Sequence, residues 1–168
     1  MSIIGRGDIA SALTDDVLKI FFASGVSNSL CTNWYEFQRE KDLLLKQNKF
    51  SHLVYFSTLS IYYADTPYTQ HKKLMERLVK DNFAVSTIVR IGNITWGNNP
   101  NTIINHFKAK IKLGEPVELK DGYRYFIDKN EFAYWMGMVP DFSTEMNITG
   151  IRMEIKQVYN KLKNFREL

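Results

Sequence analysis

Short apolar runs alternate with longer amphipathic segments along this chain of 168 residues. Each run has the length of a buried strand and is bounded by glycine or polar residues, whereas the segments between the runs have helical spacing. Strands that alternate with helices form a parallel sheet with helices on both faces. We therefore predict an α/β fold with a sheet of four or five parallel strands. These strands are expected, adjacent in this order, at residues 1–4, 17–24, 52–56 and 85–91.

The helical segments and the composition favour one domain with its own core. Hydrophobic residues make up 45% of the chain, which suits a single domain of residues 1–168. Residues 93–150 are expected to contribute a small substrate lobe, in which residues 114–125 are β-rich or irregular. Helices are expected at residues 34–46, 68–80, 102–113, 128–139 and 153–165, with a short helical stretch through residue 13.

Charge and hydropathy disfavour several classes of partner. The net charge is +4, but the basic residues are spread along the chain, and nucleic-acid binding usually needs a denser basic stripe. An anionic ligand such as a nucleotide diphosphate suits this charge better. No apolar run approaches the roughly 18 residues that cross a bilayer, and the first residues do not resemble a signal peptide. We expect no nucleic-acid partner, no membrane partner and a cytoplasmic location.

The three histidines do not indicate a metal site. His52, His71 and His106 lack metal-ligand spacing to one another and to Cys31, the single cysteine. His71 precedes Lys72 in the helix expected at residues 68–80, and we expect its side chain to face solvent.

Tyr68 and Lys72 are the strongest candidates for chemistry. They follow a buried strand that ends in hydroxyl residues, and Thr66 and Pro67 are typical of a helix start. Residues four apart share one helix face, so the phenol and the ammonium can meet. A neighbouring cation favours the phenolate and lowers the pKa of the tyrosine. The pair therefore predicts a general acid/base site for an alcohol or a carbonyl.

The spacing by itself is weak, because a tyrosine with a lysine four residues later occurs three times. The other copies are Tyr125 with Lys129 and Tyr159 with Lys163. Such short patterns carry a high false-positive risk. Only the Tyr68 copy follows a strand that ends in Ser-Thr, and that context selects it.

A glycine-rich turn follows the first apolar run. Gly5, Gly7 and Ala10 have the spacing of a dinucleotide-binding turn, in which the second glycine lets backbone amides approach a pyrophosphate. A glycine-rich turn without a ligand fits the same residues. Asp8 would place an anion near the phosphates, and Arg6 could offset that charge. The acidic residue expected about 20 positions later is absent, and small residues stand there instead.

Taken in order, these segments resemble the extended short-chain dehydrogenase/reductase family, which contains nucleotide-sugar epimerases and reductases. The resemblance is closest to short sugar-epimerase-like members of polysaccharide biosynthesis. It implies a minimal Rossmann-like sheet with helices on both faces and a small C-terminal lobe. The matching segments are residues 3–10, 22–25, 55–62, 67–72, 89–94 and 124–128.

The resemblance also implies site residues and ligands. Tyr68 would be the acid/base, Lys72 its partner and Thr58 the hydroxyl that holds the reacting oxygen. Asn93 would lie near the nicotinamide and the sugar, and Arg124 would hold the substrate diphosphate, although a surface salt bridge to an aspartate suits Arg124 equally. NAD or NADP would be the cofactor, and a homodimer is implied through the helix at residues 68–80. The implied cofactor-binding residues are Gly5, Arg6, Gly7, Ile9, Ala23, Ser24, Gly25, Ser57, Lys72 and Asn93.

The chain departs from the family in ways that keep two functions open. Only about a dozen residues join Ala10 to the second expected strand, where the family has two more strands that hold adenosine. Leu59 and Ser60 replace the acidic pair of the dehydratases, which disfavours dehydration. We predict an NAD(P)-linked epimerase or reductase acting on a sugar or nucleotide-sugar. The alternative is a non-catalytic member that binds a nucleotide-sugar or a protein partner, with a degenerate cofactor site.

Overall fold

A five-stranded parallel sheet forms the centre of the protein. The computed structural model describes residues 2–165. The strands lie in the order β1-β2-β3-β4-β7 and all neighbours are parallel. The predicted α/β parallel sheet and the adjacency of its first four strands are confirmed. The strands are β1 (Ile3–Ile4), β2 (Lys19–Phe22), β3 (His52–Thr58), β4 (Val85–Ile91) and β7 (Thr144–Ile148).

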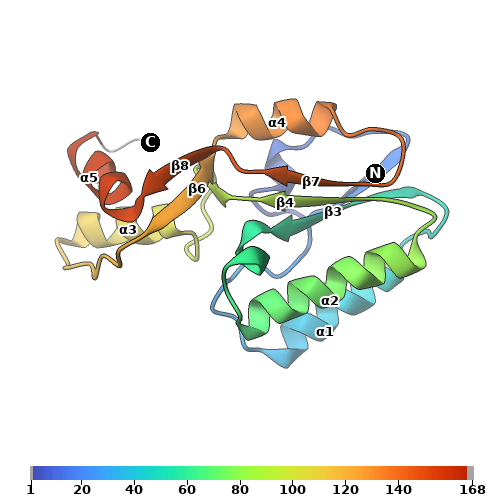
Figure 1. Ribbon diagram of the computed structural model, residues 1–168, viewed down its shortest axis with the longest axis horizontal. Helices are drawn as coiled ribbons and strands as arrows, with labels where there is room; N and C mark the ends of the chain where they lie inside the picture. The colour runs from blue at the N-terminus through green and yellow to red at the C-terminus, as the bar shows by residue number, and fades with distance from the viewer. Residues whose placement is uncertain (1, 166–168) are drawn as a thin grey trace.

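Helices cover both faces of this sheet, as predicted. Helices α1 (Trp34–Leu45) and α2 (Pro67–Asn82) lie side by side on one face, and α4 (Lys129–Gly137) lies on the other (Figure 1). The core under α1 and α2 includes Leu44, Tyr55 and Met75, none of them exposed to solvent. The core under α4 is built around Phe132 and the opposite faces of the same strands.

A smaller sheet lies beyond the carboxyl end of β4. Strand β5 (Asn93–Ile94) pairs in parallel with β6 (Tyr123–Ile127), which pairs antiparallel with β8 (Ile151–Glu154). Helices α3 (Ile103–Leu113) and α5 (Ile155–Phe165) pack together beside this sheet (Figure 1). Between β6 and β8 the chain returns to the main sheet to form α4 and β7. The sequence predicts helices near α3, α4 and α5 but no strand at β7 or β8.

The connection after β1 departs most from a complete doubly wound sheet. The expected helical stretch is a single turn of 3-10 helix, η1 (Ala10–Ala12), and Leu13 is already extended. The next element is β2, which begins at Lys19 and not at residue 17 as predicted. Val17 and Leu18 precede the strand and are exposed. In the described part of the chain, β1 therefore forms an outer edge of the sheet. None of the described helices combines the length and the apolar character needed to cross a membrane.

Candidate active site

The start of α2 places Tyr68 and Lys72 beside the end of β3. Thr66 caps the helix: its hydroxyl accepts from Thr69 N at 3.2 Å, and its own N–H donates to Thr69 Oγ1 at 2.9 Å. Pro67 takes the first turn, where the helix needs no N–H donor. A second short turn, η2 (Leu59–Tyr62), leads from β3 toward this helix, and Thr58 Oγ1 accepts from Ser60 N at its start.

Tyr68 and Lys72 are both buried, with 8% and 2% of their surfaces exposed. Lys72 Nζ lies 5.9 Å from the centre of the Tyr68 ring. Burial raises the pKa of Tyr68 above its ordinary value of 10.0, because the phenolate is poorly solvated. Lys72 and a hydrogen bond with Thr58 act to lower the pKa, whereas Glu40 and Tyr63 act to raise it. Lys72 thus acts in the expected direction, but burial outweighs it.

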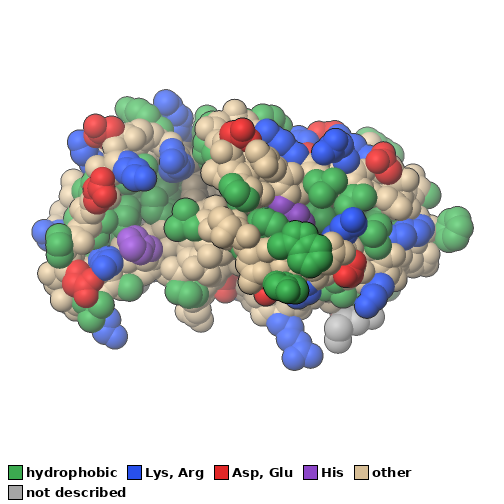
Figure 2. All heavy atoms as spheres, turned by 90° about the horizontal axis from the view of Figure 1, so that it is seen from below, with side chains coloured by type: hydrophobic (Ala, Val, Ile, Leu, Met, Phe, Trp, Pro, Cys, Tyr) green, Lys and Arg blue, Asp and Glu red, His purple; other side chains and the backbone are tan. Residues whose placement is uncertain are grey.

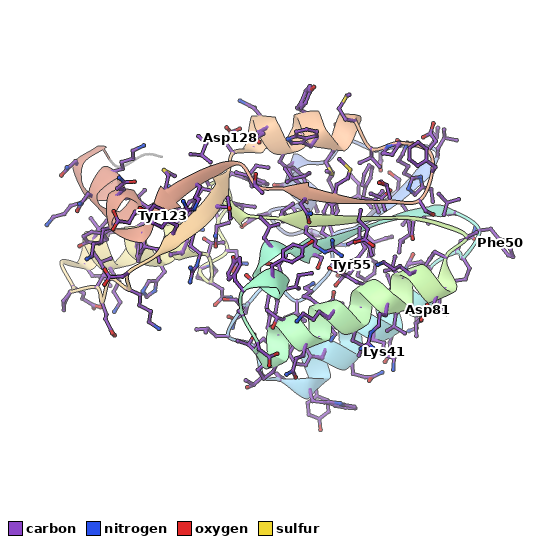
Figure 3. All side chains as sticks on the ribbon, viewed as in Figure 1. Lys41, Phe50, Tyr55, Asp81, Tyr123 and Asp128 are labelled. Carbon is purple, nitrogen blue, oxygen red and sulfur yellow. The ribbon has the colours of Figure 1, made fainter. Side chains whose placement is uncertain are left out.

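A buried carboxylate, Glu40 of α1, holds Lys72. Lys72 Nζ donates to Glu40 Oε1 at 2.9 Å and to the hydroxyl of Tyr55 at 3.0 Å. Tyr55 in turn donates to Glu40 Oε1 at 2.6 Å. Figure 3 shows the Tyr55 side chain in the layer between the sheet and the two helices. We call Glu40, Tyr55, His71 and Lys72 the Lys72 cluster.

His71 belongs to this cluster and does not face solvent, so the expectation for this residue was wrong. Only 7% of its surface is exposed, its Nε2 lies 2.9 Å from Glu40 Oε2, and its ring stacks on Phe37 at 4.4 Å between centroids. The periodicity could have indicated both residues. Glu40 shares a helix face with Phe37 and Leu44, and His71 shares one with Met75.

Burial and hydrogen bonding oppose each other in this cluster. Burial by itself would raise the pKa of Glu40. The charge of Lys72 and hydrogen bonds from His71, Tyr55 and the backbone of Val26 more than offset burial and hold the pKa well below its ordinary value of 4.5. Burial and the charge of Glu40 raise the pKa of Tyr55 well above 10.0. Glu40 is therefore a carboxylate near neutral pH, and Tyr55 is a phenol.

Ser57 belongs to a second buried cluster, deeper along the sheet. Its hydroxyl donates to Glu76 Oε1 at 2.6 Å, and Arg90 donates to both oxygens of Glu76, at 2.9 and 2.5 Å. Arg90 also donates to Glu145 Oε2 at 2.6 Å. We call Ser57, Glu76, Arg90 and Glu145 the Arg90 cluster. The hydroxyl of Ser57 is thus committed to Glu76, and Thr58 remains the hydroxyl at the end of β3.

The glycine turn after β1 lies at the same edge of the sheet. Gly5 has a φ of +131°, and a Cβ on it would lie 2.4 Å from the carbonyl oxygen of Ala23. Only glycine permits this close approach of the ends of β1 and β2. A Cβ on Gly7 would meet no atom within 4 Å. Arg6 is exposed, and Ile9 packs against the core under α4.

Asp8 is engaged by the turn that follows β5. Its carboxylate accepts from the backbone N–H of Asn98 at 3.1 Å and of Asn99 at 2.9 Å. Its carbonyl accepts from Trp96 Nε1 at 2.9 Å. The carboxylate of Asp8, which would repel a pyrophosphate at the glycine turn, is thereby held by the turn after β5.

The small residues after β2 lie between the glycine turn and the Lys72 cluster. Ala23 N donates to Ile4 O at 2.8 Å, and Ser24 O accepts from Arg39 at 3.2 Å. A Cβ on Gly25 would lie 2.7 Å from Lys72 Nζ and 2.8 Å from Glu40 Oε1. Gly25 therefore leaves room for the ion pair. A cavity of about 490 Å³ begins at Gly25 and continues along the loop to α1.

Asn93 and Arg124 stand on the smaller sheet. Asn93 lies in β5 and donates to Tyr125 O at 3.0 Å, which ties it to the strand that carries Arg124. The Arg124 guanidinium lies 5.5 Å from the centre of the Tyr63 ring. Asp121 and Asp128, the aspartates expected as possible salt-bridge partners of Arg124, are engaged elsewhere. Asp121 pairs with Lys156, and Asp128 caps α4. Arg124 thus lies close to the loop that follows η2.

The carboxyl edge of the main sheet therefore gathers most of the expected residues. Thr58, Tyr68 and Lys72 lie near one another. The Arg124 guanidinium lies over the ring of Tyr63, which belongs to the loop between η2 and α2. The glycine turn and the residues after β2 lie along that edge, which is where α/β sheets bind ligands. Ser57 is turned into the Arg90 cluster. The two other copies of the tyrosine–lysine spacing belong to the smaller sheet and its helices, Tyr159 in α5 and Tyr125 in β6.

Solved structures share this fold. Neither a protein-family model nor a curated protein matches the sequence. The enzyme WbmG of Bordetella bronchiseptica in complex with NAD matches with a TM-score of 0.70 and 17% identity, over 89% of this chain and 56% of that one. UDP-glucose 4-epimerase of Thermus thermophilus in complex with NAD matches with a TM-score of 0.65 and 15% identity, over 86% and 60%. UDP-N-acetylglucosamine 4-epimerase of Methanobrevibacter ruminantium matches with a TM-score of 0.61 and 19% identity, over 94% and 63%.

The protein is thus an α/β protein with a Rossmann-like parallel sheet. It shares this fold with all three solved structures, at 15% to 19% identity. The chain spans less than two thirds of the length of each of these three structures.

Among the described residues, the main sheet extends to only one side of the glycine turn. Gly7 is open and Gly5 closes the turn tightly, which suits close approach of a phosphate. A dinucleotide, however, normally lies across two halves of a sheet on either side of its first strand. Here β1 is an edge strand, so the half that would hold the second nucleotide has no counterpart among the described residues.

Proposed function

We propose that this protein is an NAD(P)-linked oxidoreductase of the epimerase or reductase type that acts on a sugar or nucleotide-sugar. The observation that carries the proposal is the position of Tyr68, Lys72 and Thr58. These side chains lie near one another at the carboxyl edge of a sheet whose fold is shared with a UDP-glucose 4-epimerase in complex with NAD. Their chemistry suits proton transfer to or from an oxygen of the substrate. We propose a cytoplasmic location on the basis of composition.

Each residue has a role in this proposal. Tyr68 Oη holds and moves the proton, Lys72 sets the charge beside it, and the Thr58 hydroxyl positions the reacting oxygen. Arg124 suits a diphosphate, because a guanidinium can bind one bidentately. Asn93 lies next to the strand of Arg124 and would contact the sugar. A nicotinamide cofactor, when bound, would exchange hydride with the sugar. Its holders would be Gly5, Gly7, Ala23, Ser24 and Gly25.

Calorimetric titration with NAD, NADH, NADP and NADPH tests this proposal directly. We expect binding of at least one of them by the wild type. Gly7→Ala should weaken that binding and leave the thermal midpoint unchanged, because the added methyl group meets no atom within 4 Å. If no nucleotide binds at millimolar concentration, the oxidoreductase proposal fails.

A second candidate function is non-catalytic binding of a nucleotide-sugar. The edge position of β1 favours it, because the second half of a dinucleotide has no matching surface among the described residues. Titration with a UDP-sugar in the absence of cofactor separates the two. Binding of the UDP-sugar without binding of any of the four cofactors would support the second candidate, whereas cofactor binding would support the first.

We also propose a homodimer through α1 and α2. Figure 2 shows hydrophobic side chains on the outer surface of the molecule on the side of these helices. The exposed hydrophobic residues of the two helices include Trp34, Tyr35 and Leu74. Light scattering at high concentration should give twice the chain mass. Trp34→Glu should return the mass to that of one chain, and a wild type that stays monomeric would refute the dimer.

A further inference from the structure

Glu40 is the most fully satisfied buried charge near the candidate site. None of its surface is exposed, and it comes from α1, opposite the helix that carries Tyr68. Each of its oxygens has two partners. Oε1 accepts from Lys72 Nζ at 2.9 Å and from Tyr55 at 2.6 Å. Oε2 accepts from Val26 N at 2.7 Å and lies 2.9 Å from His71 Nε2.

These contacts decide where Lys72 can stand. Its ammonium bonds both Glu40 and Tyr55 and reaches beneath Gly25, whose missing side chain provides the space. The carboxylate at 2.9 Å is closer to the ammonium than the ring of Tyr68, whose centre lies 5.9 Å away. The positive charge next to Tyr68 is therefore accompanied by a negative charge of equal size.

We propose that Glu40 is a positioning residue that fixes Lys72 beside Tyr68 and offsets its charge, so that Tyr68 rests as a neutral phenol and meets its substrate as a proton donor. The inference rests on the proposed acid/base function of Tyr68 and names its resting state. A sugar carbonyl is the reacting group that this state suits. The proton would pass from Tyr68 Oη to the carbonyl oxygen while a bound reduced nicotinamide supplied hydride to the carbonyl carbon, giving the alcohol, and the phenolate would take a proton back from solvent.

The surroundings of Tyr68 agree with this assignment. The groups that act most strongly on it are Lys72 on its own helix, Glu40 on α1, Thr58 at the end of β3 and Tyr63 after η2. Tyr55 of β3 lies between them and is itself a phenol. The balance of burial and charge raises the pKa of Tyr68. Lys72 is thus the one cation of this group, and Glu40 is its partner.

The test follows the titration of Tyr68 by NMR in protein labelled with ¹³C at the tyrosine ring, with Tyr68→Phe identifying the signal. Glu40→Gln should lower the pKa of Tyr68 by about one unit or more, because it leaves the charge of Lys72 uncompensated. Glu76→Gln is the matched control. Glu76 is also buried and paired, but its cation is Arg90, so the Tyr68 signal should titrate as in the wild type.

A double variant keeps the test decisive if Glu40→Gln does not fold. Glu40→Gln with Lys72→Met removes both charges and leaves no buried ion without a partner. If Glu40 offsets Lys72, the pKa of Tyr68 in the double variant stays within about half a unit of the wild type, since the two charges cancel. A rise of more than one unit would show that Lys72 acts without compensation and would overturn the proposal. A Tyr68 signal that titrates identically in the wild type and in Glu40→Gln would overturn it as well.

This titration needs neither substrate nor cofactor. A protein that binds no nicotinamide would refute the proposed oxidoreductase and leave the measured role of Glu40 standing. An unchanged titration would refute only the role of Glu40.

Discussion

The Lys72 cluster and the Arg90 cluster contact the same face of α2 but have different roles. Both contain a buried carboxylate, Glu40 in one and Glu76 in the other, with 0% and 5% of their surfaces exposed. One row of side chains links the two clusters along the helix at intervals of four residues: Tyr68, Lys72, Glu76 and Lys80. These two carboxylates therefore differ little in burial, and the clusters differ in the cation and in the position along the sheet.

The cations have different chemistry. Arg90 forms a bidentate pair with Glu76 and a further bond to Glu145, and these carboxylates raise its pKa above its already high ordinary value. A guanidinium keeps its proton at every physiological pH, so such a cluster holds β4 to α2 and takes no part in proton transfer. Lys72 has a compact ammonium next to a phenol at the strand ends. We infer that the Arg90 cluster stabilises the fold and the Lys72 cluster sets the chemistry.

The largest effect should come from Tyr68→Phe. The change removes one oxygen and leaves the packing intact. We expect turnover to fall roughly 10²–10⁴-fold, the usual range for a positioned acid/base. Tyr159→Phe is the control, since Tyr159 has the same spacing to a lysine but packs in α5 against Phe107 of α3. Equal activity of both variants in an assay where the wild type turns over would contradict the role of Tyr68.

Arg90→Met should produce the largest loss of stability. It leaves Glu76 buried without its cation, which typically costs about 3–5 kcal/mol of unfolding free energy. Urea unfolding followed by circular dichroism would measure the loss. Tyr68 should titrate almost as in the wild type, because Arg90 is not among the groups that shift it. A variant that stays as stable as the wild type would show that the Arg90 cluster does not support the fold.

Acid should weaken the protein through Glu40. The pKa of Glu40 is depressed in the folded state, so its contribution is complete above the ordinary value of 4.5 and is lost as the pH falls toward the folded pKa. The thermal midpoint of the wild type should therefore fall between about pH 5 and pH 3, and that of Glu40→Gln should fall less. An equal slope in both proteins would contradict the depressed pKa.

The smallest effect should come from Lys80→Met, at the far end of the same row. Lys80 pairs with Glu145, but nearly half of each side chain is exposed, at 47% and 42%. Exposed pairs contribute about 0–1 kcal/mol, and Glu145 keeps its bond to Arg90. Urea unfolding should thus differ from the wild type by less than about 1 kcal/mol. A larger loss would mean that the Arg90 cluster depends on its exposed rim.

Local patterns in the sequence were enough for most of the scaffold. Apolar runs predicted β3 and β4, and Thr66 with Pro67 predicted the start of α2. Strands β7 and β8 were not predicted, because Thr144–Ile148 and Ile151–Glu154 are short and rich in polar residues. Each becomes a strand through its partner, β7 beside β4 and β8 beside β6, and pairing between distant segments leaves little trace in local composition.

For the candidate site, local sequence was sufficient to specify the elements that carry Thr58, Tyr68 and Lys72, because helix caps and strand ends are local features. The burial of Glu40 and the inward turn of His71 came instead from the packing of distant segments. Helix periodicity places each of them on a face with apolar residues, but it does not name the partners that a buried charge there requires. Packing α1 against α2 removes them from water, and the buried charge of Glu40 must then find partners that lie 31 and 32 residues away, His71 and Lys72. Burial and the partners it requires are properties of the folded chain, and they decide how Tyr68 is charged.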